Sequence, residues 1–211
     1  MRLPPVYPIL DTTTLAQRDI SPELAAEALL DAGAQILQFR HKTHWTRDTL
    51  VTARSIAGLC AQAGATFVVN DRADYALLIP GAALHLGQDD LSPADARRIL
   101  GPATQIGFST HNEAQMRAAQ NEPIQYVAFG PIFPTSTKEN PDPTTGPLKL
   151  QAIRALTNHP LVAIGGITRT NARACLQAGA DSVAVIADML PLSCTKQTIR
   201  DRMTEWLHLT R

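Results

Sequence analysis

Acidic side chains stand at the ends of two apolar, strand-like stretches of the sequence. The run FVVNDRAD (67–74) passes from apolar residues to Asn70 and Asp71, and ALHLGQDD (83–90) ends in Asp89 and Asp90. A single carboxylate in such a place is often only a helix cap. Carboxylates from two neighbouring strands offer the hard oxygen ligands that Mg²⁺ prefers together with water and phosphate oxygens. The pattern predicts a magnesium site.

Cationic side chains follow another strand-like stretch, QILQF (35–39). Because side chains alternate along a strand, Gln38, Arg40 and Lys42 are expected on one side of it. A further lysine, Lys138, lies in a Pro/Thr-rich segment (130–146). Arg and Lys beside a magnesium site would balance the charge of a diphosphate. These residues predict an anion site next to the metal.

A second anion site is indicated further along the chain. Gly165 and Gly166 end one apolar run, and Ile186 and Ala187 end the next. In barrels of alternating strands and helices, backbone N–H groups after the seventh and eighth strands often hold a phosphate. His85, inside the run ALHLG, is expected to have a hydrogen-bonded structural role. The sequence has no HExxH motif and no apparent Ser/His/Asp set, which argues against zinc-protease and triad-hydrolase chemistry.

The elements that would position these side chains alternate along the whole chain. Helix-like text followed by a glycine and an apolar run occurs three times, with Gly33, Gly64 and Gly179 as expected helix C-caps. Capping hydroxyls predict helix starts at Ser21, at Ser92, where Asp95 would complete a capping box, and at Thr168. Strands are expected at 6–10, 35–39, 66–70, 83–87, 105–109, 125–130, 161–165 and 182–186.

This alternation predicts a parallel sheet with right-handed crossovers. Eight units in 211 residues match a small α/β TIM barrel, (β/α)₈, in which residues 1–211 form a single catalytic domain. A doubly wound open sheet is the alternative. The lack of a GxGxxG motif after the first strand, and of any GxxxxGK[ST] motif, argues against it.

Composition narrows the range of partners. The chain has 19 basic and 19 acidic residues, so no overall field attracts nucleic acid or a membrane. Three scattered cysteines fit a reducing cytosol, and no apolar run approaches the roughly 18 residues of a membrane-spanning helix. We therefore expect a cytoplasmic protein that acts on small phosphorylated molecules, with no nucleic-acid or membrane partner. Assembly into a homo-oligomer is left open.

Six motifs, in order along nearly the whole chain, resemble those of the thiamine phosphate synthase family. They are Gln38-x-Arg40-x-Lys42, Val69-Asn70-Asp71-Arg72, His85-Leu86-Gly87-Gln88-Asp89-Asp90-Leu91, Ile106-Gly107-x-Ser109-Thr110-His111, Gly130-Pro131-Ile132-Phe133-x-Thr135-x-Thr137-Lys138 and Ala163-Ile164-Gly165-Gly166-Ile167. Enzymes of this family join the pyrimidine and thiazole halves of thiamine. The resemblance therefore implies a transferase with a TIM-barrel fold and a Mg²⁺ cofactor.

The resemblance also implies roles for single residues. Asp71 and Asp90 would ligate Mg²⁺, and Arg40, Lys42 and Lys138 would act in catalysis. The residues implied to hold the aminopyrimidine and its diphosphate are Gln38, Arg40, Lys42, Asn70, Ser109 and Lys138. Those implied to hold the thiazole phosphate are Thr135, Thr137, Gly166, Ile186 and Ala187. The chain departs from the family at Ala187, where the family usually has Ser.

The implied reaction releases pyrophosphate. The nitrogen of 4-methyl-5-(2-phosphoethyl)thiazole would displace it from the methylene of 4-amino-2-methyl-5-hydroxymethylpyrimidine diphosphate, giving thiamine phosphate. We expect cleavage to run ahead of attack, because the electron-rich aminopyrimidine can stabilise a carbocation. Two alternatives remain. One is a thiazole tautomerase of the same superfamily, which would have no use for a diphosphate-binding metal site. The other is a non-catalytic barrel that binds a phosphorylated ligand.

Overall fold

The strands form a closed barrel in the computed structural model, which describes residues 3–135 and 143–210. Each strand pairs in parallel with its neighbours in chain order, and the first strand closes on the last. Within the described residues the strands are β1 (Val6–Asp11), β2 (Ile36–Arg40), β3 (Thr66–Asn70), β4 (Ala83–Leu86), β5 (Ile106–Thr110), β6 (Tyr126–Phe129), β7 (Leu161–Ala163) and β8 (Ser182–Val185). The (β/α)₈ prediction is confirmed, and the doubly wound alternative is excluded.

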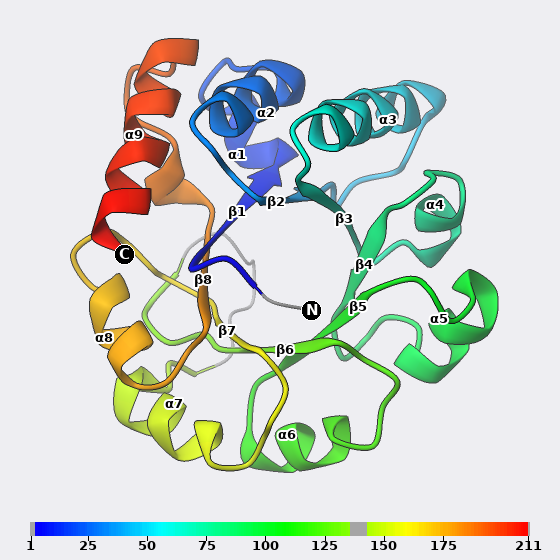
Figure 1. Ribbon diagram of the computed structural model, residues 1–211, viewed down its shortest axis with the longest axis vertical. Coiled ribbons are helices and arrows are strands. Elements are labelled where there is room, and N and C mark those ends of the chain that lie inside the picture. Colours follow the sequence, from blue (N-terminus) through cyan, green and yellow to red (C-terminus); the bar gives the residue numbers. More distant parts are fainter. Residues whose placement is uncertain (1–2, 136–142, 211) are drawn as a thin grey trace.

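Helices surround the strands as an outer ring (Figure 1). Those in the described ranges are α1 (Thr12–Ala16), α2 (Pro22–Asp31), α3 (Arg47–Gln62), α4 (Ala73–Leu77), α5 (Pro93–Leu100), α6 (Glu113–Ala119), α7 (Gly146–Arg154), α8 (Ala172–Gln177) and α9 (Lys196–Leu209), with a short 3₁₀ helix η1 (Ala187–Met189) after β8. Helix α9 packs against α2, so helices from the two ends of the chain complete the ring.

Local sequence accounts for where several helices begin and end. The hydroxyl of Ser21 accepts a hydrogen bond from the backbone N–H of Leu24 at 3.2 Å, and Ser92 caps α5 in the same way. The capping-box prediction for α5 is wrong in its second half. The Asp95 carboxylate accepts from the Ser92 hydroxyl at 2.7 Å instead of from its backbone N–H.

The three predicted glycines follow directly after helix ends, as expected. Gly33, Gly64 and Gly179 have φ angles of 98°, 68° and 99°, a left-handed conformation that glycine adopts at little cost. The start predicted at Thr168 is wrong, because α8 begins only after Asn171. The Asn171 side chain accepts from the Thr168 backbone N–H at 2.8 Å and donates to the Gly166 carbonyl at 3.0 Å, which holds residues 166–170 as a loop.

Two separate cores lie on the two faces of the barrel wall. The larger core fills the space between the strands and the helices. The smaller core fills the barrel interior and consists of Leu3, Tyr7, Ile9, Ile36, Val68, Ala83, Tyr126, Ala128, Val162 and Ala184. Because strand residues alternate between the faces, the buried polar residues Gln38, Asn70 and His85 fall on the interior side, towards the carboxyl ends of their strands.

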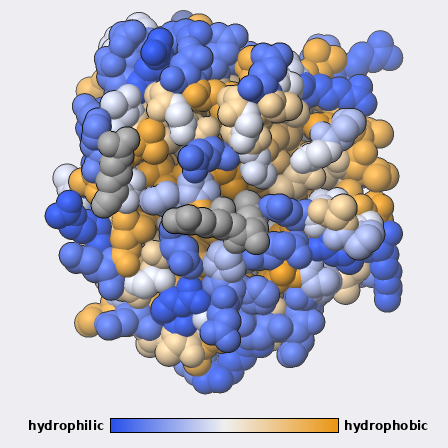
Figure 2. Space-filling view, in the orientation of Figure 1, coloured by the Kyte–Doolittle hydropathy of each residue, from blue (hydrophilic) through white to orange (hydrophobic). Residues whose placement is uncertain are grey.

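The exterior mixes polar and apolar residues. Hydrophilic and hydrophobic residues are interspersed on the face that Figure 2 shows. Exposed large hydrophobic residues occur on several different elements, for example Val51 on α3, Leu77 on α4 and Leu148 on α7. Among the described residues, no helix has both the length and the apolar character that crossing a membrane requires.

Candidate active site

A cavity of about 570 Å³ opens at the carboxyl ends of the strands. Its lining includes all the predicted site residues that the structure describes, which are Gln38, Arg40, Lys42, Asn70, Asp71, Asp90, Ser109, Thr135, Gly166, Ile186 and Ala187. Thr137 and Lys138 lie outside the described residues. Chain segments separated by almost the whole sequence therefore meet in one place, although their roles stay predictions.

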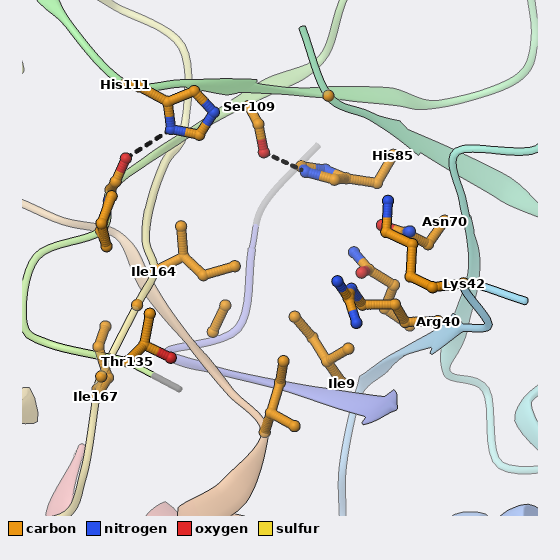
Figure 3. A pocket seen from close by; sticks show the side chains of 18 of the residues that line it. Ile9, Arg40, Lys42, Asn70, His85, Ser109, His111, Thr135, Ile164 and Ile167 are labelled. Atoms are coloured by element: carbon orange, nitrogen blue, oxygen red, sulfur yellow. Dashed lines mark hydrogen bonds between the residues drawn. The ribbon is translucent and has the colours of Figure 1, made fainter. Parts of the chain in front are cut away.

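One side of the cavity carries the cationic side chains (Figure 3). Arg40, Lys42 and Asn70 lie together there, at the ends of the neighbouring strands β2 and β3. Arg40 donates to the Asp11 carboxylate, which is 3% exposed, and Lys42 Nζ lies 2.5 Å from Asp71 Oδ2. Both cations are thus held by acids at the barrel mouth.

The sequence interpretation assigned no role to Asp11, at the end of β1. Its Oδ1 accepts from both the backbone N–H and the hydroxyl of Thr14 at 2.8 Å, and its Oδ2 accepts from Arg40. The same carboxylate therefore caps α1 and orients a cation that faces the cavity. Its position at the end of an apolar run was the signal that could have identified it.

The two predicted metal ligands face one another. Burial raises the pKa of the Asp90 carboxyl, and the adjacent Asp71 carboxylate raises it further. A hydrogen bond of 2.6 Å from the Gly87 backbone N–H acts in the opposite direction, as does the charge of Lys42. Two carboxylates that repel one another across a short gap offer the oxygen ligands of a divalent cation, whose charge would relieve the repulsion.

The donor set fits Mg²⁺ better than a metal that needs a full protein cage. Among the described residues, no group of three or more His, Cys, Asp or Glu side chains is arranged to hold a metal ion. Mg²⁺ commonly takes only one or two carboxylates and completes its shell with water and substrate phosphate oxygens. A second sign of a ligand is Asn70 Nδ2, which is buried beside these acids and makes no hydrogen bond in the described part of the chain. An orphaned buried donor of this kind is costly unless a ligand accepts from it.

The loop after β7 forms the other side of the cavity. Gly165 and Gly166 have φ angles of 96° and 61°. A Cβ atom at Gly166 would lie 2.3 Å from the Pro134 carbonyl oxygen, and one at Gly165 would lie 2.5 Å from Pro131 Cβ. Only glycines allow this loop to pack against the segment after β6, which brings Thr135 beside Gly166 in the cavity wall.

Ile186 and Ala187 complete this side, at the start of η1. Apolar side chains, including Ile9 and Ile164, separate it from the cationic side (Figure 3). The cavity therefore has a charged end, an apolar middle and a glycine-lined end. That order suits a reaction between two phosphorylated molecules whose unphosphorylated parts meet in the middle.

His85 lies inside the barrel, and its structural environment agrees with the expectation of a hydrogen-bonded role. Its ring nitrogens lie 3.0 Å from the Tyr126 hydroxyl and 2.9 Å from the Ser109 hydroxyl. Burial lowers the pKa of this histidine to about 4, so the ring is neutral near pH 7. Tyr7 and Tyr126 were not identified as site residues from the sequence, because each resembles an ordinary core aromatic on an apolar strand.

Comparison with known proteins identifies the family. A family model described as thiamine monophosphate synthase matches residues 6–189. The chain belongs to that family. A thiamine-phosphate synthase of Koribacter versatilis is 45% identical over 195 residues, which cover 90% of each chain. A thiamine-phosphate synthase of Chlorobium phaeovibrioides is 43% identical and covers 87% of each.

A solved structure gives the same result. The thiamine phosphate pyrophosphorylase of Pyrococcus furiosus superposes with a TM-score of 0.85 and 27% identity, over 98% of this chain and 95% of the other. Membership of the thiamine monophosphate synthase family confirms the resemblance inferred from the six motifs. The matched range, residues 6–189, includes every strand of the barrel and every described segment that contributes to the cavity.

Proposed function

We propose that this chain is a thiamine-phosphate synthase that condenses an aminopyrimidine diphosphate with a thiazole phosphate, giving thiamine phosphate and pyrophosphate. The observation that carries the proposal is the single cavity in which two cations, two facing carboxylates and a glycine-lined loop meet, in a chain of this family. A tautomerase that only moves a proton on the thiazole would not need the first two of these features.

The charged end of the cavity would take the diphosphate. Arg40 and Lys42 would neutralise the leaving group, and Lys138 is implied by the motif to join them. Asp71 and Asp90 would hold Mg²⁺, which when bound supplies positive charge to the diphosphate oxygens. Lys42 now pairs with Asp71 at 2.5 Å, so a bound diphosphate would give this lysine a second anionic partner.

The remaining polar groups would orient the two substrates. Gln38, Asn70 and Ser109 would bind the pyrimidine diphosphate, and the unpartnered Asn70 Nδ2 has a donor ready for it. The residues proposed to bind the thiazole phosphate are Thr135, Thr137, Gly166, Ile186 and Ala187. Because Ala187 has no hydroxyl, only its backbone could contact the phosphate, and a family serine contact is lost here.

The bond changes balance without an acid or a base. The bond between the pyrimidine methylene carbon and the diphosphate oxygen breaks, and its electron pair leaves with pyrophosphate. The thiazole nitrogen lone pair then forms the new carbon–nitrogen bond, and no proton is transferred. The protein therefore acts by neutralising the leaving group, holding the two reactants in line and excluding water.

The decisive experiment measures pyrophosphate release by the purified protein. Release is expected only when both substrates and Mg²⁺ are present, and chelation should abolish it. Isomerisation of the thiazole without pyrophosphate would establish the tautomerase instead, and binding without turnover would establish a ligand-binding barrel. We expect Lys138→Ala to lower kcat/KM at least about a hundredfold, equal to about 2.7 kcal/mol of transition-state stabilisation. A near-normal rate in that variant would contradict the role given to Lys138.

The proposal extends to where the protein works. Two of its three cysteines, Cys60 and Cys175, are buried and unpaired, and burial raises the pKa of both thiols, to about 12 and about 11. Thiols kept protonated in this way suit a reducing compartment such as the cytoplasm. Cell fractionation with an antibody to the chain tests this, and recovery outside the cytoplasmic fraction would refute it.

A further inference from the structure

A line of hydrogen bonds crosses the interior of the barrel beneath the cavity. Gln38 Nε2 donates to the Tyr7 hydroxyl at 3.0 Å, and the Tyr7 and Tyr126 hydroxyls lie 2.9 Å apart. Tyr126 contacts His85 Nδ1 at 3.0 Å, and His85 Nε2 contacts the Ser109 hydroxyl at 2.9 Å. We call these five residues the buried chain. It connects two proposed substrate-binding residues, Gln38 and Ser109, through three residues that are not proposed to contact substrate.

The interior members of the buried chain are shielded from solvent. Tyr7 is 1% exposed and Tyr126 is 0% exposed, and neither lines the cavity. The barrel makes room for them with a glycine, because a Cβ atom at Gly107 would lie 2.0 Å from Cζ of the Tyr126 ring. The Tyr126 ring thus occupies the place of a side chain on the neighbouring strand β5. Such close accommodation fixes where the phenol oxygen lies.

Counting the available hydrogens shows in which direction the hydrogen bonds of the buried chain are donated. Each hydroxyl has a single hydrogen, and the amide nitrogen of Gln38 can only donate. If Tyr7 accepts from Gln38, its own hydrogen must go to Tyr126, since the described residues offer the Tyr7 hydroxyl no other acceptor. Tyr126 then donates to His85 Nδ1, and His85 donates from Nε2–H to Ser109. The opposite direction would leave a buried hydroxyl hydrogen without an acceptor, unless the Gln38 amide were turned over.

This direction decides what the two ends can bind. Gln38 uses one N–H of its amide inside the protein, which fixes the orientation of the amide and leaves its carbonyl oxygen as an acceptor for a ligand. Ser109 already accepts from His85, so its hydroxyl hydrogen is left to donate towards an anion. An aminopyrimidine diphosphate carries an amine that donates and phosphate oxygens that accept, and it therefore matches both ends.

We propose that Tyr7, Tyr126 and His85 are positioning residues that select the aminopyrimidine over an oxopyrimidine by holding Gln38 as an acceptor and Ser109 as a donor. This inference depends on the proposed function. An oxygen in place of the amine would put two acceptors face to face at Gln38. A site built to hydrogen-bond one group rejects an analogue that cannot make the bond far more strongly than a site that only fits its shape.

The first test observes the histidine directly. In protein labelled with ¹⁵N-histidine, we expect the ring-nitrogen shifts of His85 to show a proton on Nε2 and none on Nδ1 in the wild-type chain. The His85→Gln variant, which lacks the signal, assigns it. A proton on Nδ1 would show that the buried chain runs in the opposite direction and would overturn the proposal. This measurement needs no turnover.

The second test uses variants that remove one oxygen and keep the ring. Tyr7→Phe and Tyr126→Phe free the Gln38 amide to turn over. The measured quantity is the ratio of kcat/KM for the aminopyrimidine diphosphate to kcat/KM for its oxo analogue. This ratio should fall at least about tenfold in both variants. Tyr75→Phe is the matched control, because Tyr75 lies on α4 outside the buried chain and donates only to the Trp45 carbonyl at 3.4 Å. Its ratio should stay within about twofold of wild type.

A ratio that is unchanged in both Phe variants would overturn the proposal. If one variant does not fold, the other variant and the tautomer of the wild-type chain still decide it. A wild-type chain that releases no pyrophosphate would instead overturn the proposed function, while the tautomer measurement would still determine the direction of the buried chain.

Discussion

Asp71 combines a charge with an unusual backbone conformation. Its φ angle is 65°, in the left-handed region that residues other than glycine seldom adopt, although Asp and Asn tolerate it best. The Asp71 backbone N–H donates to the His85 carbonyl at 2.7 Å, so β4 fixes this conformation. The carboxylate is consequently aimed across the mouth, towards Lys42 and Asp90.

Asp71→Asn should separate the charge from the backbone conformation. Asparagine keeps the left-handed geometry, so the melting temperature should change little, whereas kcat/KM should fall about a hundredfold and the Mg²⁺ concentration needed for half-maximal activity should rise. A magnesium titration of the rate measures both. Asp74→Asn serves as the control, since that exposed acid pairs with Arg72 and does not line the cavity. An unchanged Mg²⁺ requirement in Asp71→Asn would contradict its role as a ligand.

Asp11→Asn should weaken substrate binding more than it weakens the fold. The Asn Oδ1 can still cap α1 by accepting from Thr14, but the charge that holds Arg40 is lost. We expect KM for the pyrimidine diphosphate to rise about tenfold, with less than about 1 kcal/mol lost from the free energy of unfolding. Steady-state kinetics and urea unfolding measure the two effects. A large stability loss with unchanged KM would show that Asp11 serves the fold alone.

His85 should make the fold sensitive to mild acid. Its pKa is about 4 when buried, against 6.5 in the unfolded chain, so the unfolded state binds the proton first as pH falls. Its contribution to stability is complete above about pH 6.5 and is lost between there and about pH 4, on the order of 3 kcal/mol in all. Urea unfolding of wild type and His85→Gln at pH 7 and pH 4.5 checks the sign. If the two proteins lose equal stability, another group is responsible.

At the scale of elements, the alternation of helix and strand in the sequence was sufficient to predict the barrel. Buried parallel strands read as short apolar runs, and a glycine in the left-handed conformation precedes several of them, as at Gly64 before β3. The start of α8 could not be predicted from Thr168, because the side chain of Asn171 satisfies the Thr168 backbone and delays the helix. Tyr7 and Tyr126 show the same limit within the site, since the buried chain exists only after distant strands meet.

Gly166, in the loop after β7, can be compared directly with Gly64, which follows α3. Gly166→Ala and Gly64→Ala both place a side chain at a left-handed φ, 61° and 68°, at a cost of about 1–2 kcal/mol each. Only the first creates a clash, with the Pro134 carbonyl oxygen at 2.3 Å, since nothing lies within 4 Å of a Cβ atom at Gly64. Gly166→Ala should therefore raise KM for the thiazole phosphate at least about tenfold, while Gly64→Ala should leave it unchanged. Equal KM values in the two variants would remove Gly166 from the phosphate site.

At the scale of the whole molecule, the cavity depends on closure of the barrel. The charged end comes from segments after β2, β3 and β4, and the glycine-lined end from segments after β6, β7 and β8. The family's motifs in the sequence located both ends, because they lie within single segments. Arg40 and Asp11 were harder to connect, since their pairing depends on β1 and β2 lying side by side with Asp11 opposite Arg40.

The pairing of β1 with β8 also has a consequence for biosynthesis. Val6 is in register with Val183, so β1 waits for β8 to be synthesised before one of its edges is covered. Until then a growing chain exposes unsatisfied peptide groups on both borders of an incomplete sheet, a surface that invites wrong association. Native structure at the mouth therefore forms only after β8 has been synthesised, and a nascent chain stalled before residue 182 should need chaperone protection to stay unaggregated.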